Sequence, residues 1–228
     1  MTVSWRRHPQ FDHVALCDEA AGLAAIEEPD INLVLWHRHL DVELIQEIDK
    51  ATYDELPDES TLAERIMGTK PVAWHERLFK EVNELSSALH TIIGRPPMIN
   101  SVYRAKGTLS WSLGLNDSQR FHTDGIVGYT MLVTWRGPGT EWVPNGSPVR
   151  SMCFLGRSLK DRFTVPACFV QRVGRGEVML MRGIQGERTI LHRAPRIPYR
   201  TLRLRTVIDS LPSNAYSRRS RRLKLDAD

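Results

Sequence analysis

Two short segments, FHTDG at 121–125 and LHR at 191–193, contain the residues of this chain best suited to chemistry. They supply the imidazoles of His122 and His192 and the carboxylate of Asp124, the ligand set that holds non-haem Fe(II) and leaves coordination positions open. In a strand, residues two apart point to the same face, so His122 and Asp124 can contact one ion together. The third ligand, His192, then has to come from a neighbouring strand. The spacing therefore predicts a metal centre built between strands.

An HxD tripeptide alone is a weak signal, because it occurs by chance in many proteins. A further feature makes the pattern more specific. Arg203 follows His192 with ten residues between them, inside the strand-like run TLRLRTVID at 201–209. Arg205 has the same strand parity as Arg203, so both side chains can face the same side. The order HxD, long gap, His, ten residues and Arg is a longer and more specific pattern than a chance tripeptide.

Length and composition are ordinary for a soluble globular protein, with 228 residues, 41% hydrophobic and 25% charged. No apolar run is long enough to span a bilayer, and the N-terminus lacks the apolar segment of a secretory signal. Three cysteines without CxxC spacing indicate reduced thiols. We therefore expect a cytoplasmic protein without a membrane partner.

The net charge of +4 conceals an asymmetry between the two halves of the chain. Residues 1–99 have 9 Lys and Arg against 18 Asp and Glu, whereas residues 100–228 have 22 against 9. One interpretation is that the acidic half covers the basic half. The other is that the basic half binds anions, such as a dicarboxylate cosubstrate or an anionic substrate. Both can hold together.

The first hundred residues are mostly helical in pattern. The spacing predicts helices at 41–56, with Asp41 as N-cap, at 60–67, and at 73–94, where Gly94 ends the helix. The apolar run at 31–40 is typical of a strand or a buried segment. We expect residues 1–98 to form a mainly helical region that packs on the rest of the protein.

After Pro97 the pattern changes to short β-branched or aromatic segments separated by Gly, Pro, Asn and Asp. This is typical of an antiparallel barrel or jelly roll. The predicted fold class is α+β, with a β core at 99–211 covered by the N-terminal helices. Residues 212–228 form a basic tail that includes RRSRRLK; a solvated terminus explains it better than a nucleic-acid or localisation patch.

The block RFHTDGIVGYTMLVTWRGPGTEWVP at 120–144, followed by GEVMLMRG and LHRAP, resembles an uncharacterised bacterial family of domains of unknown function. That family has an FHxD element, a TxRGPGTEW element and a downstream HR(S/A)P, and the resemblance covers most of the chain. The metal pattern is more distantly similar to the cupin-like, double-stranded β-helix oxygenases that use Fe(II) and 2-oxoglutarate. This resemblance implies a jelly-roll core and an oxygenase activity.

The same resemblance implies roles for individual residues. His122, Asp124 and His192 would bind Fe(II). A basic residue about ten positions past the distal histidine grips the far carboxylate of 2-oxoglutarate in these enzymes, which favours Arg203 and keeps Arg205 in reserve. On the strand after HxD, Tyr129 and Thr134 are candidate hydrogen-bond partners of the cosubstrate. A carboxylate ligand at position 124 implies hydroxylation or a related oxidation rather than halogenation.

The segment GPGTEWVP at 137–144 has two interpretations. Its glycines permit a tight turn, and Glu141 with Trp142 could line the mouth of a substrate site. Equally, it could be a structural hairpin that joins two strands of the barrel.

We therefore expect an Fe(II)- and 2-oxoglutarate-dependent dioxygenase that uses O2. It would oxidise an unactivated C–H of a small molecule, amino acid or peptide, with succinate and CO2 as co-products. One alternative is an oxygenase or demethylase directed at nucleic acid, as the basic half allows. Another is a non-enzymatic, cupin-like protein that binds Zn(II) or Ni(II), because His2Asp alone does not select iron. The oligomeric state stays open.

Overall fold

The structure is a computed structural model, and it describes residues 4–57, 73–106, 121–123, 128–154, 157–183, 189–198 and 200–210. Within these residues the protein is a mixed α+β structure dominated by strands. The helical segments are η1 (Ala20–Glu27), α1 (Val42–Lys50), α3 (Ala73–Ile93) and η3 (Ala167–Phe169). The strands are β1 (Trp5–Arg7), β2 (Val14–Cys17), β3 (Leu33–Trp36), β4 (Met98–Lys106), β5 (Tyr129–Arg136), β6 (Glu141–Val143), β7 (Arg150–Phe154), β8 (Arg157–Thr164), β9 (Gln171–Arg172), β10 (Val178–Arg182), β11 (Leu191–Arg193) and β12 (Leu202–Asp209).

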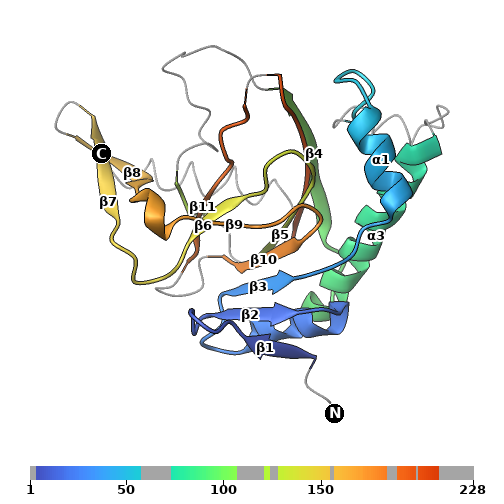
Figure 1. Ribbon diagram of the computed structural model, residues 1–228. Helices are drawn as coiled ribbons and strands as arrows, with labels where there is room; N and C mark the ends of the chain where they lie inside the picture. The colour runs from blue at the N-terminus through green and yellow to red at the C-terminus, as the bar shows by residue number, and fades with distance from the viewer. Residues whose placement is uncertain are drawn as a thin grey trace, which may run out of the picture.

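A large sheet forms the centre of the molecule, with strand order β1-β2-β3-β10-β5-β12-β4. Its neighbouring strands are antiparallel except for β2 and β3, which are parallel. A small sheet has the order β11-β6-β9, and β7 with β8 forms a separate hairpin that projects from one side (Figure 1). The single-residue bridge from His122 to His192 adds residues 121–122 to the free edge of β11.

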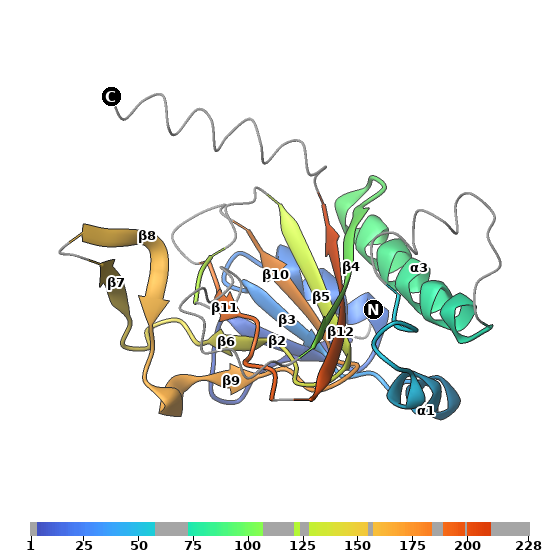
Figure 2. The same ribbon diagram turned by 90° about the horizontal axis from the view of Figure 1, so that it is seen from above.

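The elements form three layers. Helices α1 and α3 lie on one side of the large sheet, and β6, β9 and β11 lie on the other (Figures 1 and 2). Two apolar clusters fill the spaces between the layers. One joins the helices and η1 to the large sheet through residues such as Leu78, Val82 and Trp135. The other lies between the two sheets and includes Leu132 and Trp142.

Local signals in the sequence explain the helices. Asp41 is the N-cap of α1, and its side chain accepts a hydrogen bond from the backbone N–H of Glu43 at 2.9 Å. Helix α3 presents Leu78, Val82, Leu85 and Leu89 at helical spacing, and all four are buried. Gly94, at φ 67, follows its last residue in the left-handed conformation that glycine adopts without strain. These features confirm the predicted helices at 41–56 and 73–94, although α1 ends at Lys50.

The structure corrects the predicted architecture in one respect and extends it in another. A closed barrel is not found in the described part of the chain, where the strands form separate sheets. The N-terminal region also contributes β1, β2 and β3 to the large sheet, with β3 paired to β10, in addition to its helical cover. The predicted helix at 60–67 and the basic tail at 212–228 lie outside the described residues.

None of the helices in the described ranges is both long and apolar enough to span a membrane.

Candidate metal centre

The two predicted histidine ligands lie side by side on neighbouring strands. The N–H of His122 donates to the carbonyl of His192, and the N–H of His192 donates to the carbonyl of His122, both at 3.0 Å. Directly opposed residues in an antiparallel pair project to the same face of the sheet. Their imidazole centroids are accordingly 4.6 Å apart, with the ring planes tilted by 50°. This backbone pairing therefore joins two histidines that have 69 residues between them in the sequence.

The ring of His192 is oriented by a backbone contact. Its Nδ1 lies 3.3 Å from the carbonyl oxygen of Ile190, and His192 is buried. A carbonyl can only accept a hydrogen bond, so Nδ1 must carry the proton in this contact. In the neutral ring the lone pair is then on Nε2, which is the form in which a histidine binds a metal with its other nitrogen fixed by a backbone carbonyl.

The third predicted ligand, Asp124, lies outside the described residues. Among the residues that the structure does describe, no group of three His, Cys, Asp or Glu side chains could bind a metal ion. The structure thus brings together two of the three predicted ligands. Two facing imidazoles are the nitrogen donors that iron, zinc and nickel accept, so their chemistry fits such an ion.

The paired histidines face the space between the two sheets. His192 pairs with Trp142 of β6, so these side chains share a face, and Trp142 is 2% exposed within the cluster between the sheets. His192 also borders a small gap of about 10 Å³ together with Thr130 of β5 and Met181 of β10. Trp142, predicted at a substrate mouth, is therefore a buried neighbour of His192, and its ring meets Phe11 edge-on at 5.6 Å.

Arg203 is buried on the face of the large sheet that looks toward the small sheet, with 1% of its surface exposed. Its Nε donates to the carbonyl of Pro138 at 2.8 Å. Its Nη2 contacts the hydroxyls of Thr134 at 3.5 Å and Thr140 at 3.4 Å. These two contacts are long for hydrogen bonds from a charged donor, which are usually about 2.7–2.9 Å. A carboxylate is a stronger acceptor for this guanidinium than either hydroxyl.

The other predicted cosubstrate residues have different positions. Thr134 contacts Arg203, as described, and Arg205 pairs with Thr134 in the sheet, so it lies on the same face. Arg205 is half-buried, whereas Arg203 is fully buried. Tyr129 packs against the cluster on the opposite, helix-covered face, and its backbone N–H donates to the Ser210 hydroxyl at 2.7 Å. The structure therefore groups Thr134 with the arginines and separates Tyr129 from them.

Glu141 lies on the other face of the small sheet from His192, because it neighbours Trp142 in the same strand. Its carboxylate accepts hydrogen bonds from Arg172 Nη2 at 2.5 Å and from Arg193 Nε at 2.7 Å. Burial disfavours this charge, but the two arginines outweigh that effect and lower the pKa of Glu141. The guanidinium of Arg193 also lies 4.2 Å from the centroid of Phe121. This cluster links β6, β9 and β11 on the face of the small sheet opposite the two histidines.

Two features of the site have no clear signal in sequence. Thr140 and the Pro138 carbonyl hold Arg203 because the turn before β6 folds back onto β12. At Gly137 (φ 79) a Cβ atom would lie 2.5 Å from the carbonyl oxygen of Leu202, so this close approach requires glycine. Thr130 donates to the buried carboxylate of Asp209 at 2.7 Å on the same face.

The fold and the site together define a strand-rich α+β protein with two facing histidines between its sheets. The chain belongs to the DUF1826 family, described as a protein of unknown function, whose profile matches residues 17–209. This confirms the prediction of an uncharacterised family that covers most of the chain. No curated protein matches the sequence.

Proposed function

We propose that this protein is an Fe(II)- and 2-oxoglutarate-dependent dioxygenase that oxidises a C–H bond of a small molecule, amino acid or peptide. The proposal rests on the pairing of His122 with His192, which holds two nitrogen donors on one face of adjacent strands. An unfolded chain rarely has a preformed site, so the fold that brings these two donors together is what makes a metal site here possible.

The strand order supports a jelly-roll core. From residue 98 to residue 209, eight segments follow in the order β4, 121–122, β5, β6, β9, β10, β11 and β12, leaving aside the β7–β8 hairpin. They fall alternately into the large and the small sheet, except that β6 and β9 are both in the small one. The jelly roll is likewise an eight-stranded, two-sheet structure, and cupins are among its examples.

In this proposal His122, His192 and Asp124 bind Fe(II), each histidine as the neutral ring. The contact of His192 Nδ1 with the Ile190 carbonyl keeps Nε2 as the metal-binding nitrogen. Arg203 binds the distal carboxylate of 2-oxoglutarate, replacing its long contacts to Thr134 and Thr140 with a bidentate, charge-assisted pair. Arg205 is the reserve for this role.

When bound, Fe(II) and 2-oxoglutarate supply the oxidising chemistry with O2, and succinate and CO2 are formed. The chain contributes orientation and exclusion of water. The apolar residues between the sheets, including Leu132, Trp142 and Met181, give the site a low-dielectric wall, which strengthens the hydrogen bonds made by Arg203. Arg193, stacked on Phe121, fixes the strand of His192 against that of His122 from behind.

The test is anaerobic titration of the full chain with Fe(II) and 2-oxoglutarate, following the visible charge-transfer absorption of an Fe(II)–2-oxo acid chelate. Succinate is then measured after O2 is admitted, with cell lysate as a source of substrates. His192→Ala is expected to abolish both signals. His90→Ala, which removes an exposed histidine of α3, is the matched control and is expected to leave both intact.

The outcomes separate the three functional classes. Metal binding without any affinity for 2-oxoglutarate would overturn the oxygenase and favour a metal-binding protein. If oligonucleotides stimulate succinate formation in a salt-dependent manner, the substrate is a nucleic acid and not a small molecule or peptide. Wild-type protein that behaves like His192→Ala would refute the metal centre itself.

A further inference from the structure

A pocket of about 570 Å³ opens beside the small sheet, where β6 ends and β11 begins. Its walls come from the segment before β2, from the residue pair Val143 and Leu191, and from the turn after β6. The backbone N–H of Asn145 in that turn lies 3.2 Å from Nε2 of His13, which ties the two walls together. Pockets of this volume typically hold small molecules.

The pocket lies next to the candidate metal centre. Thr189 lines both this pocket and the small gap that contains His192 and Thr130. Leu191, which also lines the pocket, is the residue before His192 in β11. Leu191 and its partner Val143 point to the face of the small sheet opposite His192, because successive residues of a strand alternate between faces. A ligand that reached Thr189 would therefore end beside the gap that contains His192.

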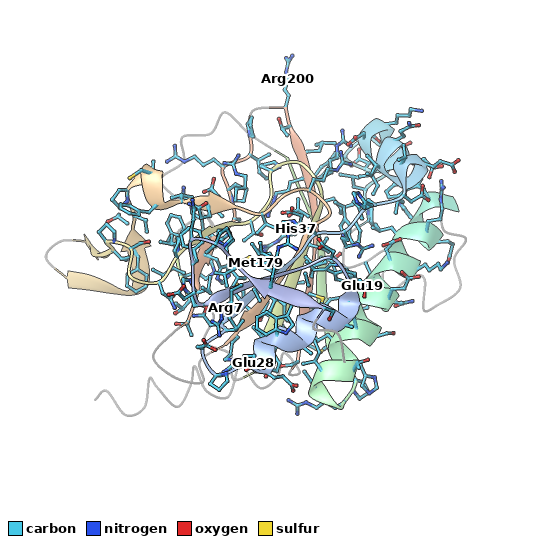
Figure 3. The ribbon with its side chains drawn as sticks, turned by 60° about the horizontal axis from the view of Figure 1, so that its bottom comes forward. Arg7, Glu19, Glu28, His37, Met179 and Arg200 are labelled. Carbon is cyan, nitrogen blue, oxygen red and sulfur yellow. The ribbon has the colours of Figure 1, made fainter. Side chains whose placement is uncertain are left out.

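The described residues that line the pocket carry a net negative charge. Two carboxylates, Asp12 and Asp30, are among its lining residues, and no Lys or Arg is among the described ones. Arg7 of β1, labelled in Figure 3, pairs with Asp30 at 2.6 Å and donates to the backbone carbonyl of Asp12, also at 2.6 Å. In the described part of the chain the Asp12 carboxylate itself has no ion pair. One negative charge is thus left without a counterion.

The part of the pocket beside the small sheet is apolar. Val143 and Leu191 pair across β6 and β11, and both line the cavity. The lining thus combines carboxylates from the segments around β2 with aliphatic side chains from β6 and β11. This combination complements a molecule with a cationic head and a hydrocarbon stem.

We propose that this pocket binds a small aliphatic cation, an amine or a guanidine, with its charge at Asp12 and its hydrocarbon stem toward Leu191 and Thr189. The assignment of this ligand as the substrate rests on the proposed oxygenase function, whereas its binding does not. The C–H bonds nearest the histidines would then belong to the stem and not to the carbon bearing nitrogen.

The experiment uses n-hexylamine, which is protonated at neutral pH, with hexanol and hexanoate as neutral and anionic analogues. Binding to the metal-free full chain is measured by ligand-observed NMR and calorimetry. Hexylamine is expected to bind at least tenfold more tightly than either analogue. Asp12→Asn is expected to weaken hexylamine about tenfold. Asp18→Asn, at an exposed carboxylate paired with Arg6, is the matched control and should have no effect.

Asp12 is exposed and its side chain makes no contact that the fold requires, so Asp12→Asn should fold normally; circular dichroism checks this. The assignment of this pocket as a cation site would be wrong if the three probes bound equally. It would also be wrong if Asp12→Asn left the affinity for hexylamine unchanged. Mn(II) then tests the orientation, because a paramagnetic ion at the histidines should broaden the methyl signal more than the CH2–N signal. If hexylamine binds but Mn(II) broadens neither of its two signals, the proposed metal centre is refuted and the cation site is retained.

Discussion

The two faces of the large sheet differ in what they bury. On the face toward α1 and α3, strands β5, β10 and β12 present mainly apolar side chains, and the indole of Trp135 donates to Thr206 at 2.8 Å. On the face toward the small sheet, the same strands bury Arg203, Asp209 and two threonines. Buried polar groups destabilise a fold unless they are paired, so a face that concentrates them is the better candidate for function. We therefore expect the helix-covered face to contribute mainly stability, and we place the proposed chemistry on the other face.

The largest expected effect is on the helix-covered face. Trp135 is fully buried in the cluster that also contains residues of α1 and α3, so Trp135→Ala should lower the free energy of unfolding by about 4 kcal/mol. Denaturant unfolding measures this. Val42→Ala, at a side chain that is 65% exposed, should change it by less than about 0.5 kcal/mol. A loss of stability below about 1 kcal/mol for Trp135→Ala would contradict a mainly structural role for this face.

On the opposite face, Arg203→Met is expected to weaken 2-oxoglutarate binding about a hundredfold, since it removes one partner of a buried charged pair. The free energy of unfolding should also fall, by about 1–3 kcal/mol, because the carbonyl of Pro138 loses its donor. Anaerobic calorimetry with Fe(II) present measures the affinity. Arg205→Met is the matched variant and should have an effect of threefold or less. If Arg205→Met weakened 2-oxoglutarate binding more than Arg203→Met does, Arg205 and not Arg203 would be the residue that binds the cosubstrate.

Glu141 tests the cluster behind the histidines through its pH dependence. The arginines lower its pKa from the ordinary value of 4.5 despite its burial, so the unfolded state binds a proton more readily than the folded state. The ion pairs therefore stabilise the fold fully above about pH 4.5 and are lost as the pH falls below it. Glu141→Gln should lower the free energy of unfolding by about 2 kcal/mol near neutral pH and by less in acid.

Unfolding curves of wild type and Glu141→Gln across this pH range provide the measurement. Glu19→Gln, at an exposed glutamate, is the control. If Glu141→Gln loses as much stability on acidification as the wild type, the carboxylate is not the group that titrates.

The smallest expected effect concerns the hydroxyl beside Arg203. Thr134→Val keeps the shape of the side chain and removes a contact of 3.5 Å. We expect 2-oxoglutarate affinity to fall about threefold, within the range of a single weak hydrogen bond. The titration used for Arg203 measures it, and an effect as large as that of Arg203→Met would mean that Thr134 contacts the cosubstrate directly.

Local patterns predicted a large part of this protein. Helix α3 follows from its apolar spacing and from Gly94, and α1 from the cap at Asp41, because helices depend on residues three and four apart. The short segments after residue 97 predicted strands because they are rich in β-branched and aromatic residues and are separated by turn residues. The resemblance to an uncharacterised family was confirmed, and the metal centre and cosubstrate stay predictions.

Pairings between distant residues could not be predicted in this way. The sequence by itself determined the types and the spacing of His122, His192 and Arg203. Only the tertiary structure decided that the two histidines face each other, that Thr140 contacts Arg203, and that Glu141 turns away from them. Strand partners are selected by packing across the whole molecule, and a shift of one residue would reverse every face. For the same reason the acidic N-terminal half supplies Asp12 to a pocket that also includes Leu191, although 178 residues lie between these two residues.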